Sequence, residues 1–183
     1  MPSVLFVAPF FLPTTLRFVE AMADLPGVRL GLISQDPAER LPQRLRAKLA
    51  AHWRIEDGLN ADQIAHAAGA LAGRLGPIHR LVGALEELQV PLAIARTKLG
   101  IAGMGVEAAR NFRDKARMKS VLRAAGIPCA RHKLAMSEAD AWECPAALGF
   151  PLVIKPPAGA GAKNTFRVDG PDALREEPST HSA

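Results

Sequence analysis

Three short apolar runs are the feature that most limits what this sequence can fold into. They are rich in Leu, Val and Ile, and they occupy residues 3–8, 28–34 and 78–85. Runs of this length and composition are typical of buried strands. The segments between them have helical signals, and we expect Thr14 or Thr15 to cap one helix and Asn60 to cap another. Strands that alternate with helices predict an α/β fold, a Rossmann-like parallel sheet with helices on its faces.

The composition supports a packed core and leaves the partner open. Hydrophobic residues make up 49% of the chain, which is enough for a globular interior. The formal net charge is +5, which permits a nucleic-acid partner without requiring one. Leu41, Leu45 and Leu49 recur every four residues in the basic segment 39–54 and predict a helix there. A nucleic-acid surface usually adds stacking aromatic side chains, and this segment has only Trp53, so we do not expect nucleic acid as a partner.

Cysteine usage and the amino terminus indicate a cytoplasmic protein. Cys129 and Cys144 have neither a CxxC partner nor a nearby pair of histidines, so we expect two reduced thiols rather than a disulfide or a metal site. The first residues lack the positive region of a targeting signal, and Pro9 and Pro13 interrupt their apolar stretch. No window reaches the roughly 20 uninterrupted apolar residues that a membrane span needs. We therefore expect no membrane association.

A glycine- and alanine-rich stretch near residue 100 predicts a boundary between two units. The first, residues 1–104, is the expected Rossmann-like domain, and the second, residues 105–170, is a smaller α+β lobe. In the second we expect helices at 110–124 and 137–147, and strands at 128–135, 151–155 and 166–168. The last two strands would form a hairpin. Residues 171–183 are polar and are expected to fray.

The predicted hairpin carries the residues that are most suggestive of chemistry. Lys155 follows an apolar strand, and Gly159 and Gly161 come soon after it in a loop of small residues. A fixed ammonium group beside a bare backbone loop can hold phosphate. Lys115, forty residues upstream (155 − 115), is a second candidate. A surface lysine at a strand end and an ordinary hairpin turn are the simpler interpretations, and the Walker A and dinucleotide-binding patterns are both missing.

Order and spacing strengthen these candidates. Residues 111–128 have the pattern N-x-R-D-K-x-x-M-K-x-x-L-x-x-A-G-I-P, and residues 149–156 read G-F-P-L-V-I-K-P before the small-residue loop. This order of motifs resembles the ATP-grasp superfamily, which includes biotin carboxylase, the large subunit of carbamoyl phosphate synthase and amino-acid ligases. The resemblance implies that Lys115 contacts ATP near the α-phosphate and that Lys155 bridges the α- and β-phosphates. It also implies that a loop at about 158–165 covers the β- and γ-phosphates, through Gly159, Gly161, Ala162 and Thr165.

The resemblance further implies a carboxylate ligase that works through an acyl-phosphate, with ATP and Mg²⁺ as cofactors and an unidentified carboxylate substrate. The superfamily places its adenine hinge and its magnesium ligands in a second lobe, for which this sequence has no counterpart. We therefore assign no catalytic and no metal-binding residue, leave open whether the chain is an enzyme, and expect it to be inactive alone. The alternative is a non-catalytic nucleotide-binding or interaction module. A homo-oligomer and a complementing subunit both stay open.

Overall fold

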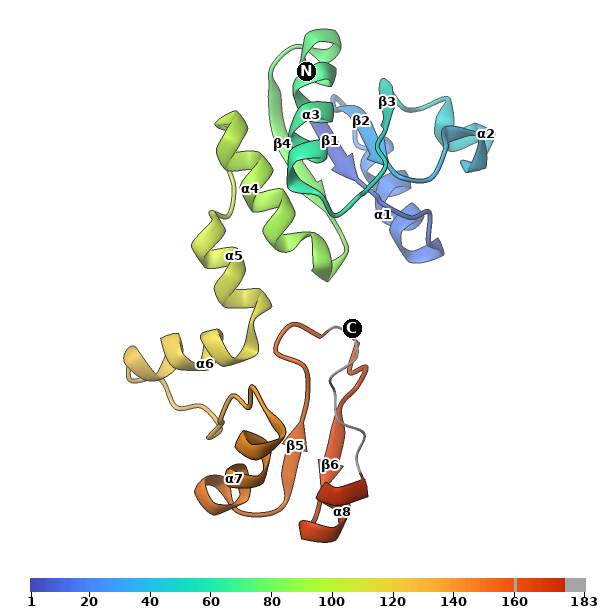
Figure 1. The fold of residues 1–183 in the computed structure, drawn as a ribbon. Helices are drawn as coiled ribbons and strands as arrows, with labels where there is room; N and C mark the ends of the chain where they lie inside the picture. Colours follow the sequence, from blue (N-terminus) through green and yellow to red (C-terminus); the bar gives the residue numbers. More distant parts are fainter. Residues whose placement is uncertain (160, 177–183) are drawn as a thin grey trace. The chain divides into compact units, whose positions relative to one another are not determined.

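The computed structural model describes residues 1–159 and 161–176. The chain divides into two compact units, residues 1–110 and residues 111–183 (Figure 1). The change of unit comes six residues after the predicted boundary at residue 104 (110 − 104). The roles assigned to the two domains stay a prediction.

The amino-terminal unit is built on a four-stranded, wholly parallel sheet with the order β3-β2-β1-β4. Its strands are β1 (Ser3–Val7), β2 (Arg29–Ser34), β3 (Ala51–Arg54) and β4 (Ile78–Gly83). All five residues of β1 are buried, as expected for the centre of a sheet that is covered on both faces. The α/β prediction is confirmed.

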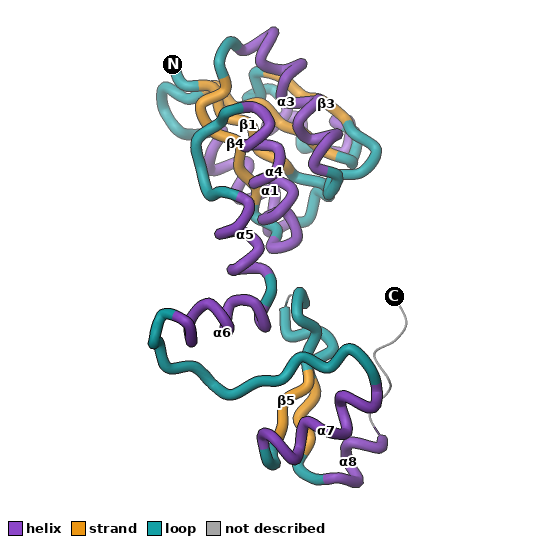
Figure 2. The backbone as a smooth tube through the Cα atoms, turned by 60° about the vertical axis from the view of Figure 1, so that its left-hand side comes forward, coloured by secondary structure: helices purple, strands orange, loops and turns teal. Residues whose placement is uncertain are grey.

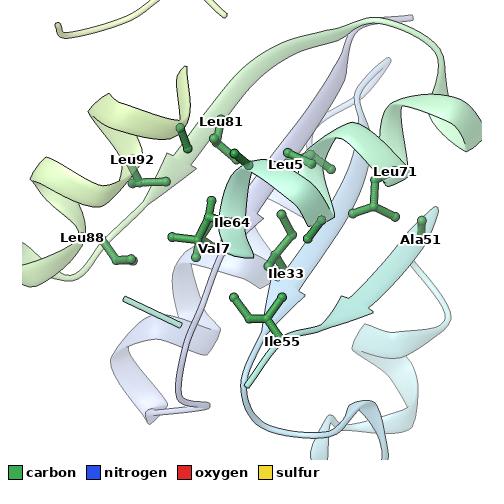
Figure 3. Close-up of a cluster of buried hydrophobic side chains, with 14 of the residues drawn as sticks. Leu5, Val7, Ile33, Ala51, Ile55, Ile64, Leu71, Leu81, Leu88 and Leu92 are labelled. Carbon is green, nitrogen blue, oxygen red and sulfur yellow. The ribbon is translucent and has the colours of Figure 1, made fainter. Parts of the chain in front are cut away.

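Helices cover both faces of this sheet. They are α1 (Pro13–Ala23), α2 (Gln43–Arg46), α3 (Ala61–Leu75) and α4 (Gln89–Leu99), with the short 3₁₀ turns η1 (Ala38–Arg40) and η2 (Glu86–Leu88). Leu5 and Val7 of β1 pack against α3, η2 and α4 on one face (Figure 3). Val4 and Phe6 point to the other face, toward α1 and α2. Successive side chains of β1 point to opposite faces of the sheet and thus contribute to two separate hydrophobic cores.

One of the two predicted helix caps is confirmed and one is wrong. The Asn60 side chain accepts hydrogen bonds from the backbone N–H groups of Asp62 and Gln63, at 2.9 and 3.1 Å. Helix α1 instead begins at Pro13, one residue before the predicted threonines. Proline suits this position because the first helical N–H has no intrahelical acceptor. The Thr15 hydroxyl is buried inside the helix and finds no hydrogen-bond partner among the described residues.

The predicted basic helix over 39–54 is also wrong. This segment forms η1, the one-turn helix α2 and then strand β3, which pairs with β2. Leu41 and Leu45 are buried because they pack onto the sheet, not because they form a helical stripe. Arg44 forms an ion pair with Glu20, and Lys48 forms one with Asp24. The segment therefore lacks the continuous basic helix on which a nucleic-acid interface would depend.

The remaining elements are α5 (Val106–Arg113), α6 (Lys115–Ala124), α7 (Glu138–Leu148), β5 (Leu152–Ile154), β6 (Phe166–Val168) and α8 (Pro171–Glu176). The predicted hairpin is confirmed, since β5 and β6 pair in antiparallel orientation. The single helix predicted over 110–124 is wrong. Its backbone turns extended at Asp114, with φ −97° and ψ 113°, so that α5 ends and α6 begins.

Two further expectations for the second unit have different outcomes. The helix predicted over 137–147 is confirmed as α7, and the Ser137 hydroxyl caps it by accepting a hydrogen bond from the Asp140 N–H at 3.1 Å. The predicted strand at 128–135 is wrong: these residues form a loop between α6 and α7 (Figure 2). A strand needs a neighbouring strand to satisfy the hydrogen bonds of its backbone N–H and C=O groups. Among the described residues, β5 pairs only with β6.

The expected frayed tail falls only partly within the described residues. Residues 171–176 form α8, and residues 177–183 lie outside the described part. Over the described residues, no helix is both long and apolar enough to cross a membrane.

Candidate phosphate-binding site

The β5–β6 hairpin fixes the position of Lys155. Leu152 pairs with Val168, and Ile154 pairs with Phe166. The side chains of Leu152 and Val168 are buried, with relative exposures of 9% and 0%. This pairing anchors the hairpin, and Lys155 follows directly at the end of β5. Its ammonium group therefore extends from a strand whose backbone is held by a ladder.

The start of α6 places Lys115 beside the same loop. The Asp114 carboxylate caps the helix by accepting hydrogen bonds from the N–H groups of Ala116 and Arg117, at 2.9 and 3.0 Å. Lys115 is the first helical residue, and its backbone N–H donates to the Pro157 carbonyl at 2.9 Å. The helix start and the chain beyond β5 are thus joined by a backbone hydrogen bond.

Two cationic side chains strengthen this junction. Lys115 Nζ donates to the Gly159 carbonyl at 2.7 Å, and Arg113 Nη1 donates to the same oxygen at 3.3 Å. Two cationic donors that converge on one carbonyl oxygen could also donate to an anionic oxygen. The arrangement therefore gathers two cationic donors at one point of the loop.

A small pocket lies at this junction. Its lining comes from α6, the end of β5 and the hairpin loop, namely Lys115, Lys155, Pro156, Gly159, Ala162, Lys163 and Thr165. Its volume is about 30 Å³. That volume admits water or part of a phosphate group but is too small to enclose a whole nucleotide.

The charged side chains that line the pocket have one sign. Three lysines contribute to the lining, and among the described residues no carboxylate or histidine lines it. Among the described residues, none of these lysines forms an ion pair with an acidic side chain. Like charges that converge without a counter-charge favour an anionic ligand.

The loop itself has an uncommon backbone conformation. Gly161, Ala162 and Asn164 have φ values of 63°, 57° and 53°, in the left-handed region. Glycine adopts this region freely, whereas alanine has a Cβ that makes it unfavourable. Successive N–H groups in such turns can form an anion-binding concavity.

The structure brings most of the predicted site residues together. Lys115, Lys155, Gly159, Ala162 and Thr165 all line the pocket, whereas Gly161 is in the loop but not in the lining. Sequence reasoning missed Pro156 and Lys163 as lining residues. The signal for Lys163 was present in the stretch AGAGAK at 158–163, but a lysine in a loop of small residues has no distinctive pattern.

Three of the shifted pKa values in this unit arise from contacts at or near α7. The pKa of Asp140 is lowered, chiefly because its carboxylate accepts a hydrogen bond from the Met136 N–H. The pKa of Lys133 is raised by its hydrogen bond to Glu143, and burial raises the pKa of the Cys144 thiol. None of these residues lines the pocket.

Known proteins resemble this chain in sequence and in fold. An L-arginine-specific L-amino acid ligase from Bacillus subtilis is 36% identical over 110 residues, which are 58% of this chain and 26% of the ligase. A D-alanine–D-alanine ligase from Pseudomonas putida is 36% identical over 98 residues, 54% of this chain and 28% of that enzyme. No family model matches the sequence.

Among solved structures, the biotin carboxylase domain of 2-oxoglutarate carboxylase from Hydrogenobacter thermophilus, in complex with MgADP, superposes with a TM-score of 0.73 at 20% identity. The match covers 94% of this chain and 38% of that one. These three proteins are ATP-grasp enzymes. The chain is similar in sequence and in fold to ATP-grasp enzymes. The resemblance seen in the motifs of the second half is thereby confirmed, and the structural neighbours correspond in their ATP-grasp amino-terminal domains. The chain spans 26% and 28% of the lengths of the two sequence relatives.

Proposed function

We propose that this chain provides phosphate-binding groups for ATP in an ATP-grasp ligase that joins a carboxylate to an amine. The observation that carries the proposal is the meeting of Lys115 and Lys155 at one pocket beneath a loop of small residues. These residues lie far apart in the sequence, and a shared pocket is what a common polyphosphate ligand requires. The two sequence relatives are named as ligases of amino acids, which supports a carboxylate and an amine as the substrate classes.

The residues present suit the polyphosphate of ATP. Lys115 and Lys155 supply ammonium groups, and the loop with its left-handed residues supplies backbone N–H groups. Binding of a polyphosphate here would neutralise the converging positive charge and hold the terminal phosphoryl group for transfer to a carboxylate. The Lys115 ammonium group now donates to the Gly159 carbonyl. A phosphate oxygen would replace this carbonyl as the acceptor or share the ammonium group with it.

The described residues do not offer a comparable place for magnesium. No group of three or more His, Cys, Asp or Glu side chains among them is arranged to hold a metal ion. Mg²⁺ binds through oxygen ligands, usually one or two carboxylates together with substrate phosphates. The binding proposed here therefore relies on the lysines and the loop, and we expect the 183-residue chain by itself to bind ATP without turnover.

Calorimetry with ATP, ADP and a nonhydrolysable ATP analogue tests the proposal. We expect Lys155→Ala to weaken ATP binding by about 10- to 100-fold, because one hydrogen bond to a charged group contributes roughly 1.5–3 kcal/mol. Lys48→Ala is the matched control, since it removes the same charge from the other unit, where Lys48 pairs with Asp24. Equal effects of the two substitutions would indicate nonspecific charge attraction. The absence of binding at millimolar nucleotide would refute the proposal.

A second measurement addresses turnover. With ATP, Mg²⁺ and a mixture of amino acids, we expect ADP release by this chain to stay at background. Amino-acid-dependent ADP release above background, lost in Lys155→Ala, would show that the chain is a complete catalyst and would contradict this part of the proposal.

A further inference from the structure

One arginine holds the segment between α4 and α5, residues 101–105, which we call the linker (Figure 1). Arg96 of α4 donates from Nη1 to the Leu81 carbonyl of β4 at 3.0 Å, and from Nη2 to the Met104 carbonyl at 3.3 Å. Strand β4 lies at one edge of the sheet, where backbone groups on the outer side lack a strand partner. A single planar guanidinium group therefore joins the sheet edge to the linker.

The linker packs directly on the Arg96 side chain. A Cβ added to Gly103 would lie 2.8 Å from Arg96 Cδ and 2.9 Å from Arg96 Nε, so only glycine allows the backbone this close approach. The Ile101 N–H also donates to the Arg96 carbonyl at 3.0 Å. Arg96 thus holds the linker through its backbone and through its side chain.

The arrangement is held by few contacts and carries a cost. Arg96 Nε is buried and has no hydrogen-bond partner among the described residues, and a buried donor without an acceptor loses its hydration uncompensated. Burial lowers the pKa of this guanidinium group for the same reason. Residues 102–105 are exposed and so gain little from apolar burial. The linker can therefore leave Arg96 without unfolding the sheet.

We propose that Arg96 and Gly103 form a latch that holds the linker on the amino-terminal unit, and that opening this latch frees the connection to the carboxy-terminal unit. In the closed state the guanidinium group spans the Leu81 and Met104 carbonyls. In the open state water hydrates the guanidinium group, and residues 101–105 become a flexible tether. The latch thereby sets how freely the unit that carries the candidate site moves. The inference does not depend on the proposed binding of ATP.

Gly103→Ala tests the latch in the full chain, with Gly105→Ala as the matched control. Neither glycine has a φ in the left-handed region, so alanine strains neither backbone, and a Cβ at Gly105 meets nothing within 4 Å. At Gly103 the Cβ displaces the end of the Arg96 side chain. We expect ¹⁵N relaxation order parameters over residues 101–105 near about 0.85 in the unmodified chain and in Gly105→Ala, and below about 0.6 in Gly103→Ala.

Arg96→Lys tests the other half of the latch. A single ammonium group cannot reproduce the two-pronged bonding of arginine, so the linker should become as flexible as in Gly103→Ala. Lys98→Ala is the matched control, because Lys98 is on the same helix but pairs with Asp62. Amides of β1 should keep their chemical shifts in all four variants, which separates opening of the latch from unfolding.

The outcomes decide for or against the latch. Order parameters below about 0.6 over residues 101–105 in the unmodified chain would show that the linker is never held, and would refute it. A linker as rigid in Gly103→Ala as in Gly105→Ala, or one that stays rigid in Arg96→Lys, would refute it too. Loss of the β1 shifts in Gly103→Ala would show that the linker cannot leave without unfolding. No nucleotide is used, so failure of the proposed ATP site leaves these results intact.

Discussion

Asp114 provides the most direct test of how the fold positions the candidate site. Its carboxylate accepts hydrogen bonds from the N–H groups of Ala116 and Arg117, at 2.9 and 3.0 Å. The helix that it caps begins with Lys115, whose backbone donates to Pro157 and whose ammonium group donates to Gly159. Loss of the cap should therefore loosen the first turn of α6, where the pocket lysine is held.

The expected size of this effect follows from the capping geometry. Replacing a capping Asp by Ala costs about 1 kcal/mol. Since 1.4 kcal/mol corresponds to a factor of ten, the equilibrium for opening the first turn should rise roughly fivefold. Asp114→Asn keeps an oxygen acceptor and loses only the interaction of the charge with the helix dipole, about 0.3–1 kcal/mol.

Amide hydrogen exchange of the full chain, resolved by residue, is the suitable assay. In Asp114→Ala we expect exchange at Ala116 and Arg117 to accelerate roughly fivefold, while amides of α3, capped by Asn60 in the other unit, keep their rates. Asp114→Asn should exchange at a rate between the two. Equal exchange in Asp114→Ala and the unmodified chain would show that the cap does not hold the start of α6, and the reasoning would be wrong.

Two further predictions concern the amino-terminal unit. Gly31→Ala should lower the free energy of unfolding by about 1–3 kcal/mol through overpacking, because the added Cβ would lie 2.5 Å from Leu5 Cδ2. Gly69→Ala in α3, where an added Cβ meets nothing within 4 Å, should instead raise the free energy of unfolding by up to about 1 kcal/mol. Urea unfolding in which both substitutions change this free energy in the same direction would contradict the packing argument. Burial lowers the pKa of His52 below its ordinary value of 6.5, so the folded state binds fewer protons than the unfolded state below that pH, and the free energy of unfolding should fall as the pH decreases through this range. His52→Gln should remove this part of the pH dependence, and unfolding curves at about pH 7.5 and about pH 5 that differ equally in both proteins would refute it.

The candidate site was predictable where it follows local rules. Lys155 at a strand end and the glycine loop after it could be read from the residues themselves. That Lys115 and Lys155 line one pocket could be proposed only through the family resemblance, because no local rule brings together residues forty positions apart (155 − 115). Lys163 was missed because its place in the lining depends on hairpin register and on the left-handed backbone around it.

The errors in the fold have a common origin. Leu41, Leu45 and Leu49 satisfy a helical period, yet the chain there ends in strand β3 because β2 offers it a partner. The opposite occurs at 128–135, where strand-like residues remain a loop. Asp114 ends one helix and caps the next, which a continuous helical pattern conceals. In each case the presence or absence of a non-local partner, or a local side-chain bond, outweighed a weak propensity.

The sequence alone determined the order of the buried strands, the α/β class and the hairpin that presents Lys155, because apolar periodicity and turn residues act within a few positions along the chain. Only the tertiary structure decided which lysines meet and how the loop aims them. That depends on strand register and on hydrogen bonds such as the one from Lys115 to Gly159, between residues far apart in the chain. The free energy that fixes such contacts comes from the fold as a whole, so no local stretch of residues specifies them.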